Sequence, residues 1–184
     1  MGYALSAGLQ TTYTETPPVA LQGQLVHKVT ILPGKNNDAA SMPFGTAVAF
    51  KPSGATSDFD VTFPANSTDQ IKGIVLRGEY ARAWTDDVGT FGELDSTGVK
   101  VGFMMDLLVE GIVWVNCITG CSPGDRGWVC YATGGTTYTA TGQLGNANDA
   151  TPSKTFDITK QTEWLTTAAA AGLAMIKVNF TAKA

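Results

Sequence analysis

Three cysteines, Cys117, Cys121 and Cys130, lie within fourteen positions of one another, and the chain holds a single histidine, His27. The spacing C-x3-C-x8-C supplies one thiolate fewer than a structural zinc site needs, and His27 lies ninety residues upstream. A redox pair would be expected to read C-x-x-C beside a helix N-terminus, and this stretch has neither feature. The thiols are therefore predicted to be small buried parts of the scaffold, with no metal and no cofactor.

The densest acidic group, Asp86, Asp87, Glu93 and Asp95, lies in a glycine-rich segment that reads mostly as a loop. Functional carboxylates need burial or charged partners to tune their pKa, and nothing in the sequence indicates either. Catalysis by a serine or cysteine nucleophile usually recruits a histidine, and no motif surrounds the only one. The sequence predicts that this protein is not an enzyme.

Tyr80 and Trp84 could contribute to a carbohydrate-binding site. Two nearby aromatic rings can stack on a sugar, so a β-sandwich carbohydrate-binding or adhesion module is the alternative class of function. Core packing or a subunit interface is the more common use of such side chains.

Composition excludes two further classes. The net charge is −4 and no Lys or Arg run occurs, which argues against a nucleic-acid partner. The longest apolar run, residues 103–115, is broken by Asp106 and Glu110 and is shorter than the ~20 residues of a spanning helix. No basic region precedes an apolar segment at the start, so no secretion signal and no membrane partner are expected.

The segments that carry the cysteines and the other candidate residues are predicted to be mostly short strands. Charged residues make up only 15% of the chain while glycine occurs 21 times, a composition that favours strands and turns over exposed helices. Residues 164–172 have helical character but are too few for a stable helix. The predicted strands are 25–32, 45–50, 60–63, 72–78, one long bent strand or two short ones within 101–116, then 126–132, 136–142, 155–159 and 173–180.

Two local features refine this prediction. Gly111 is expected at a bend in the long apolar stretch. Ser122-Pro123-Gly124-Asp125 suits a type II turn, with Ile112–Val115 and Gly127–Tyr131 as the strands on either side. The pattern predicts an all-β fold, a single sandwich- or barrel-like domain of about eight to ten short strands over residues 25–184.

Residues 1–24 are predicted to form an extended N-terminal arm. Pro17 and Pro18 favour an extended course, and no hydrophobic periodicity develops before Leu21. We expect this arm to contact a partner or a neighbouring subunit through Tyr3, Leu5, Leu9, Tyr13, Pro17 and Pro18.

The order of the glycine- and proline-containing motifs is similar to that of a known family. These motifs are Gly23-Gln24-Leu25, then 43–48 (PFGTAV), 73–75 (GIV), 111–115 (GIVWV) followed by Pro123-Gly124-Asp125, and 172–176 (GLAMI). Over most of its length the chain resembles the structural cement, or head decoration, proteins of tailed bacteriophages. The three cysteines and the long 78–98 segment depart from that family's pattern.

The resemblance implies a non-enzymatic protein that binds the major capsid protein on the outer face of the head. There it would assemble as a homotrimer in the virion, after synthesis in the host cytoplasm, and bridge neighbouring capsomers to stabilise the shell. No catalytic residues are implied. Four Trp and eight Phe, a large aromatic content for one small β domain, also favour self-association.

Overall fold

The computed structural model describes residues 20–51, 54–77, 98–133, 136–149 and 154–181. These residues form an all-β protein, as predicted, and none of their helical segments is long and apolar enough to cross a membrane. The strands are β1 (Leu25–Asn36), β2 (Met42–Pro43), β3 (Ala47–Phe50), β4 (Asp60–Thr62), β5 (Ile71–Val75), β6 (Gly98–Val99), β7 (Met104–Cys117), β8 (Trp128–Cys130), β9 (Leu144–Gly145), β10 (Thr155–Asp157), β11 (Thr162–Trp164) and β12 (Gly172–Asn179), with one short 3-10 helix, η3 (Thr159–Gln161).

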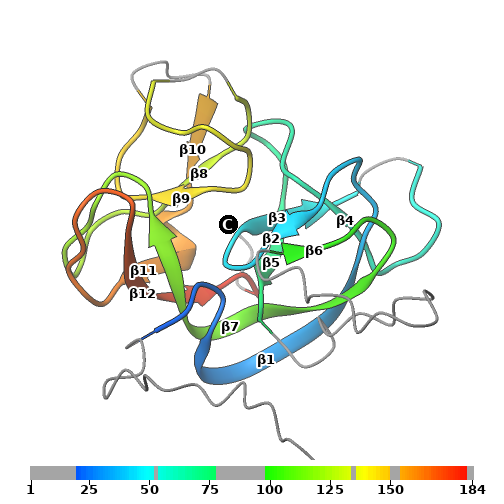
Figure 1. Cartoon of the computed structure of the whole chain (residues 1–184), viewed down its shortest axis with the longest axis horizontal. Helices are drawn as coiled ribbons and strands as arrows, with labels where there is room; N and C mark the ends of the chain where they lie inside the picture. The colour runs from blue at the N-terminus through cyan, green and yellow to red at the C-terminus, as the bar shows by residue number, and fades with distance from the viewer. Residues whose placement is uncertain (1–19, 52–53, 78–97, 134–135, 150–153, 182–184) are drawn as a thin grey trace, which may run out of the picture.

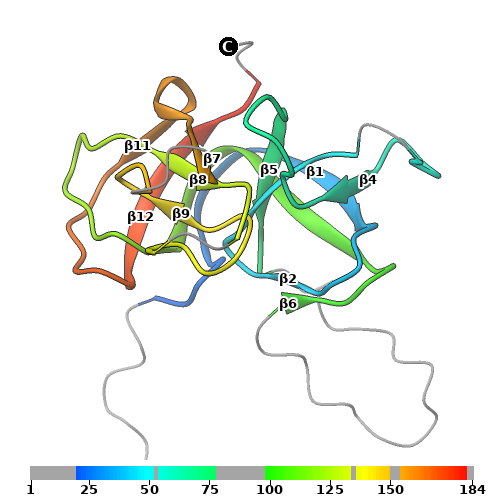
Figure 2. The ribbon, with the colours of Figure 1, turned by 90° about the horizontal axis from the view of Figure 1, so that it is seen from above.

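Five strands close into a small barrel. Their order is β1, β4, β3, β5 and β7, and β7 pairs again with β1 to complete the ring. The two-stranded sheet of β2 and β6 lies at one end of this ring (Figure 2). Closure leaves few free backbone edges, which is one way in which β proteins avoid uncontrolled pairing.

A second lobe is built on the C-terminal half of β7. There β12 pairs with β7 over eight residue pairs and β11 pairs with β12, while β9, β8 and β10 continue from Cys117 at the end of β7. Figure 2 shows the barrel and this second lobe side by side, with β7 running through both. The long strand is therefore the element that fixes the two lobes relative to each other.

Gly111 lies at the point where β7 passes from one lobe to the other, as the sequence predicted. Its φ is +149°, and a Cβ at this position would lie 2.3 Å from the carbonyl oxygen of His27 on β1. The pairing of β1 with β7 shifts register on both sides of Lys28, close to this residue. Only glycine allows the two backbones to approach so closely, so β7 is one bent strand and not two.

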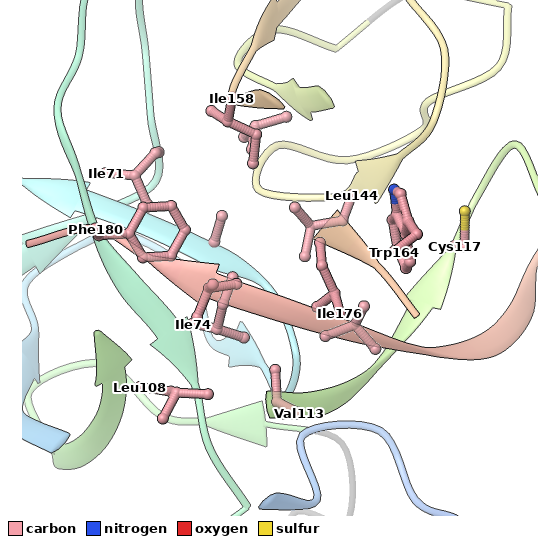
Figure 3. Packing of buried hydrophobic residues seen from close by; sticks show 14 of the residues in the cluster. Ile71, Ile74, Leu108, Val113, Cys117, Leu144, Ile158, Trp164, Ile176 and Phe180 are labelled. Atoms are coloured by element: carbon pink, nitrogen blue, oxygen red, sulfur yellow. The ribbon is translucent and has the colours of Figure 1, made fainter. Parts of the chain in front are cut away.

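One hydrophobic cluster runs through both lobes. Figure 3 shows Ile74 of the barrel and Leu144, Ile176 and Phe180 of the second lobe pointing into this common core. Trp164 is fully buried, and its indole N–H donates to the carbonyl oxygen of Arg126 at 3.1 Å. A second cluster fills the barrel interior and consists of Met42, Phe44, Val48, Val61, Val75, Val99, Met105 and Leu107.

The predicted strand over Thr136–Gly142 is wrong in the part that the structure describes. These residues form turns, which the Gln143 side chain holds by accepting the backbone N–H groups of Thr139 and Ala140 at 2.8 and 3.0 Å. Tyr138 is buried, and its hydroxyl donates to the carbonyl oxygen of Ala147. The alternation of Thr and Tyr thus reflects side-chain hydrogen bonding in a loop rather than a pleated strand.

Two further expectations need correction. The strands on either side of the Ser122–Asp125 turn do not pair with each other, because Leu144 of β9 lies between Cys117 and Val129. The turn itself is present, since the Asp125 N–H donates to the Ser122 carbonyl and Gly124 has a φ of +85°. The first strand does not end before Pro33, since β1 continues to Asn36. A proline is tolerated there because, within the described part of the chain, β1 is paired on one edge only at this position.

Candidate assembly surfaces

The three cysteines are buried, as predicted, and form no disulfide bond with one another. The Cys121 thiol donates to the carbonyl oxygen of Thr166 at 3.4 Å, and Cys130 donates to that of Ala132 at 3.2 Å. Burial raises the pKa of Cys121 to about 12, so this thiol is protonated and a poor nucleophile near neutral pH. Within the described part of the chain, no three His, Cys, Asp or Glu side chains are placed to hold a metal ion.

The residues predicted for contacts lie elsewhere in the chain. Tyr3, Leu5, Leu9, Tyr13, Pro17 and Pro18 of the arm lie outside the described residues, as do Tyr80, Trp84 and the acidic group at 86–95. The arm contacts therefore remain a prediction, and no observation favours the carbohydrate-binding alternative.

The point at which the arm joins the folded body is described, and it is firmly held. The Gly23 N–H donates to the Trp114 carbonyl at 2.8 Å, and the Trp114 N–H donates to the Gln24 carbonyl at 3.0 Å. The Arg77 N–H donates to the Gly23 carbonyl at 2.9 Å. Any force on the arm is thus transmitted to β7, the central strand of both lobes.

Strand β1 combines exposed apolar side chains with a backbone edge that is largely unpaired among the described residues. It pairs with β7 along most of its length, but among the described residues only Lys35 and Asn36 pair with β4 on the other side. Val26, Val29 and Leu32 are 47%, 58% and 41% exposed. Figure 1 shows β1 along the outside of the molecule. We refer to residues 25–34 and these three side chains as the β1 edge.

Such an edge is unusual for a protein that acts alone. Unpaired N–H and C=O groups on a long apolar strand form a template for another chain, and soluble monomers normally protect it with several charges, bulges or a cover. Lys28, Pro33 and the register shifts of β1 against β7 protect the β1 edge only in part. Val29 is still the most exposed of the nine large apolar side chains that are exposed in the described residues. The β1 edge is therefore the best candidate for a protein contact on this part of the chain.

A second apolar group lies at the far end of β1. The Lys35 N–H donates to the carbonyl oxygen of Phe59, and Lys35 pairs with Met104 on β7. Phe59, Met104 and nearby Val101 are 47%, 46% and 49% exposed. We call these three side chains the barrel-end group.

The loop that carries Phe59 is fixed by the carboxylate of Asp60. This group accepts hydrogen bonds from the N–H and hydroxyl of Thr56 at 2.6 and 2.9 Å, from the N–H and hydroxyl of Ser57 at 3.2 and 2.9 Å, and from the Asn37 amide at 2.7 Å. The hydrogen bonds, the Thr56 N–H first, hold the pKa of Asp60 well below its usual value. The apolar side chain next to it therefore sits on an ordered loop.

Sequence patterns did not reveal the β1 edge. The stretch Leu25–Leu32 alternates only roughly, and an apolar strand with little alternation normally indicates burial on both faces. The missing information was strand pairing. Only the fold shows that, among the described residues, no strand pairs with one side of β1 over most of its length.

Comparison with known proteins decides the family. The family described as "Structural cement protein (E217 gp24/Pam3 gp6)" matches residues 9–179 of the chain. The chain belongs to this phage structural cement family. A search of the curated proteins finds no match.

Membership fixes the broad role of the protein. A phage structural cement protein is a virion component that associates with capsid proteins and stabilises the capsid. A structural role fits buried, protonated thiols and a closed β barrel with an apolar edge. Family membership also agrees with the prediction that the protein acts by binding and not by catalysis.

Proposed function

We propose that this cement protein binds the outer face of the phage head and bridges neighbouring capsomers. The observation that carries the proposal is the β1 edge. Its apolar side chains, and backbone groups that are unpaired among the described residues, suit the contact between copies from which a bridging assembly is built. A shell under internal genome pressure is reinforced by a rigid bridge, and the closed barrel with its common core provides such rigidity.

The proposed assembly state is a homotrimer, with the β1 edge at the contact between copies. Three apolar side chains that are about half exposed in one copy would be removed from water in the assembly. Three copies also present three arms to the shell, so a weak contact by each arm gains from the effective concentration that the others provide.

The arm is proposed to grip the major capsid protein or the adjacent subunit through Tyr3, Leu5, Leu9, Tyr13, Pro17 and Pro18. The hydrogen bonds of Gly23 and Gln24 with Trp114 give the arm a fixed point of attachment. Because prolines have a fixed φ, the segment before that point loses less conformational entropy on docking than a flexible one would.

Electron cryo-microscopy of heads assembled without the protein, before and after its addition, tests the proposal. We expect added density on the outer face that connects neighbouring capsomers. Density confined to the interior, or to a single capsomer with no bridge, would contradict the proposed position. Chain lacking residues 2–18 is the matched sample, and we expect it to bind heads about tenfold more weakly, or by about 1.4 kcal/mol.

A further inference from the structure

A cleft of about 510 Å³ lies between the barrel and the second lobe. The barrel contributes Pro43 of β2 and Phe63, which follows β4, and the second lobe contributes Leu144 of β9. Asn116 and Ile118 line it from the end of β7, and Gln22 lies at the point where the arm joins the body. The walls are thus a mixture of apolar surface and neutral polar groups.

The described residues that line the cleft include no Lys, Arg or His. Asp38 is the one charged residue among those that line it in the described chain. Its carboxylate already accepts hydrogen bonds from the Ala39 N–H at 2.7 Å, the Thr62 hydroxyl at 2.5 Å and the Phe63 N–H at 3.0 Å. A phosphate or another anionic group would find no positive counter-charge among the described lining residues, whereas a neutral segment of polypeptide would need none.

One buried acceptor atom in the cleft wall, the side-chain oxygen Oδ1 of Asn116, has no hydrogen-bond donor among the described residues. A buried acceptor without a partner is costly, so an occupant that brings an O–H or N–H group to it is favoured. The nearby apolar surface of Phe63 and Ile118 favours an occupant with an apolar body and a polar tip, which is the character of a tyrosine side chain.

The N-terminal segment, residues 1–19, has this chemistry. Glu15 is its only charged side chain, and it contains Tyr3 and Tyr13. It joins the described chain at Ala20, two residues before Gln22 in the cleft wall. The prolines at 17 and 18 disfavour an immediate reversal into the cleft of the same copy.

The length of chain between each tyrosine and Ala20 decides which of the two could reach a cleft on a neighbouring copy. The seventeen residues from Tyr3 to Val19 can span up to about 58 Å, whereas a domain of this size is about 40 Å across. The seven residues from Tyr13 to Val19 can span only about 24 Å. Only the longer segment reaches across a neighbouring copy.

We propose that the arm of one copy docks in this cleft of a neighbouring copy, with the ring of Tyr3 against Phe63 and Ile118 and its hydroxyl donating to Oδ1 of Asn116. The inference rests on the proposed self-assembly and names the contact that each arm makes within it. It assigns the cleft to a second copy of this chain and not to the capsid protein.

Photo-crosslinking of the full-length chain tests this assignment. Benzoylphenylalanine replaces Leu5, which leaves the Tyr3 hydroxyl intact, and samples are irradiated both in solution and on decorated heads. We expect crosslinks between two chains, mapped by mass spectrometry to the cleft positions 22, 38–46, 63, 116–118, 133 and 139–144. Crosslinks within one chain, to the capsid protein or to other segments would overturn the proposal, as would the absence of inter-chain crosslinks from both samples.

A double-mutant cycle tests the hydrogen bond itself. We expect Tyr3→Phe and Asn116→Leu each to lower the inter-chain crosslink yield by about tenfold, equivalent to about 1.4 kcal/mol. The double variant should fall no further than either single variant, because both remove the same interaction. Additive losses, or no loss in either variant, would refute the pairing.

The control is Asn66→Leu, the same substitution at an exposed loop position outside the cleft, which should leave the yield unchanged. Circular dichroism of every variant establishes that the fold is intact. Decoration of heads is measured on the same samples by sedimentation. Heads that are decorated without cleft crosslinks refute this inference and leave the proposed function standing, whereas undecorated heads refute the proposed function.

Discussion

Replacing Val29 by lysine should separate self-association from folding. Val29 is 58% exposed on the β1 edge, so a lysine there remains in water in the isolated chain. Exposed substitutions of this kind change the free energy of unfolding by only about 0.5 kcal/mol. In the proposed trimer, the same position is covered by a neighbouring copy.

The expected loss follows from the exposed fraction. Complete burial of a valine side chain is worth roughly 1.5–3 kcal/mol, so burying the exposed half or so contributes about 1 kcal/mol per contact. A lysine without a partner adds a desolvation cost of about 2 kcal/mol or more. A total of about 3 kcal/mol corresponds to a contact roughly 150-fold weaker.

Light scattering after gel filtration over a range of concentrations measures this change. We expect the wild-type chain to be a trimer at micromolar concentration and Val29→Lys to be a monomer that is still folded by circular dichroism. The control Val101→Lys, in the barrel-end group, starts from a similar 49% exposure and should remain trimeric. A wild-type monomer, or a Val29→Lys variant that assembles like the wild type, would refute the role of the β1 edge.

Three further predictions concern the scaffold. Gly111→Ala should destabilise the fold by about 3 kcal/mol in denaturant titrations, because the added methyl group meets the β1 backbone at a positive φ. The control Gly124→Ala should cost only about 1 kcal/mol, because Gly124 has a φ of +85° but no atom within 4 Å of the added Cβ. Equal losses of stability in the two variants would contradict the steric argument. Replacing all three cysteines by alanine should cost about 1 kcal/mol per site and leave assembly intact, whereas unfolding of the native protein by a chelator would show that a bound metal had been missed. Hydrogen bonds lower the pKa of the Asp60 carboxyl, so its contribution to stability is complete at pH values well above the ordinary pKa of 3.8 and is lost as the pH falls through the pKa of the folded state. Asp60→Asn should therefore be less stable than the wild type at neutral pH and approach the wild type in acid. A difference in stability that does not change with pH would count against this account.

Local chemistry explains which strands were predictable. The β-branched and apolar runs at Ala47–Phe50, Ile71–Val75 and Gly172–Asn179 form strands close to the predicted ranges. Strands of two residues such as β2, β6 and β9 carry no periodic signal, because their existence depends on a partner far away in the chain. The same reason explains the missed insertion of Leu144 between the two strands that flank the Ser122–Asp125 turn.

The candidate surfaces were predictable only in part. Counting ligands argued against a zinc site, and burial of the cysteines was expected because free thiols behave as small apolar groups. The exposure of Val26 and Val29 could not be inferred, because an apolar strand looks the same in sequence whether or not a neighbour covers it. The arm contacts stay predictions that the crosslinking and truncation experiments decide.

Heat-induced release of DNA from phage heads tests the central claim most directly. Heads assembled without the protein are heated with a DNA-binding dye, in the absence of the purified chain and after saturation with it. A protein that bridges capsomers must raise the temperature of genome release, and the Val29→Lys variant should raise it less than the wild type does. If saturated and bare heads release their DNA at the same temperature, the protein does not cement the shell.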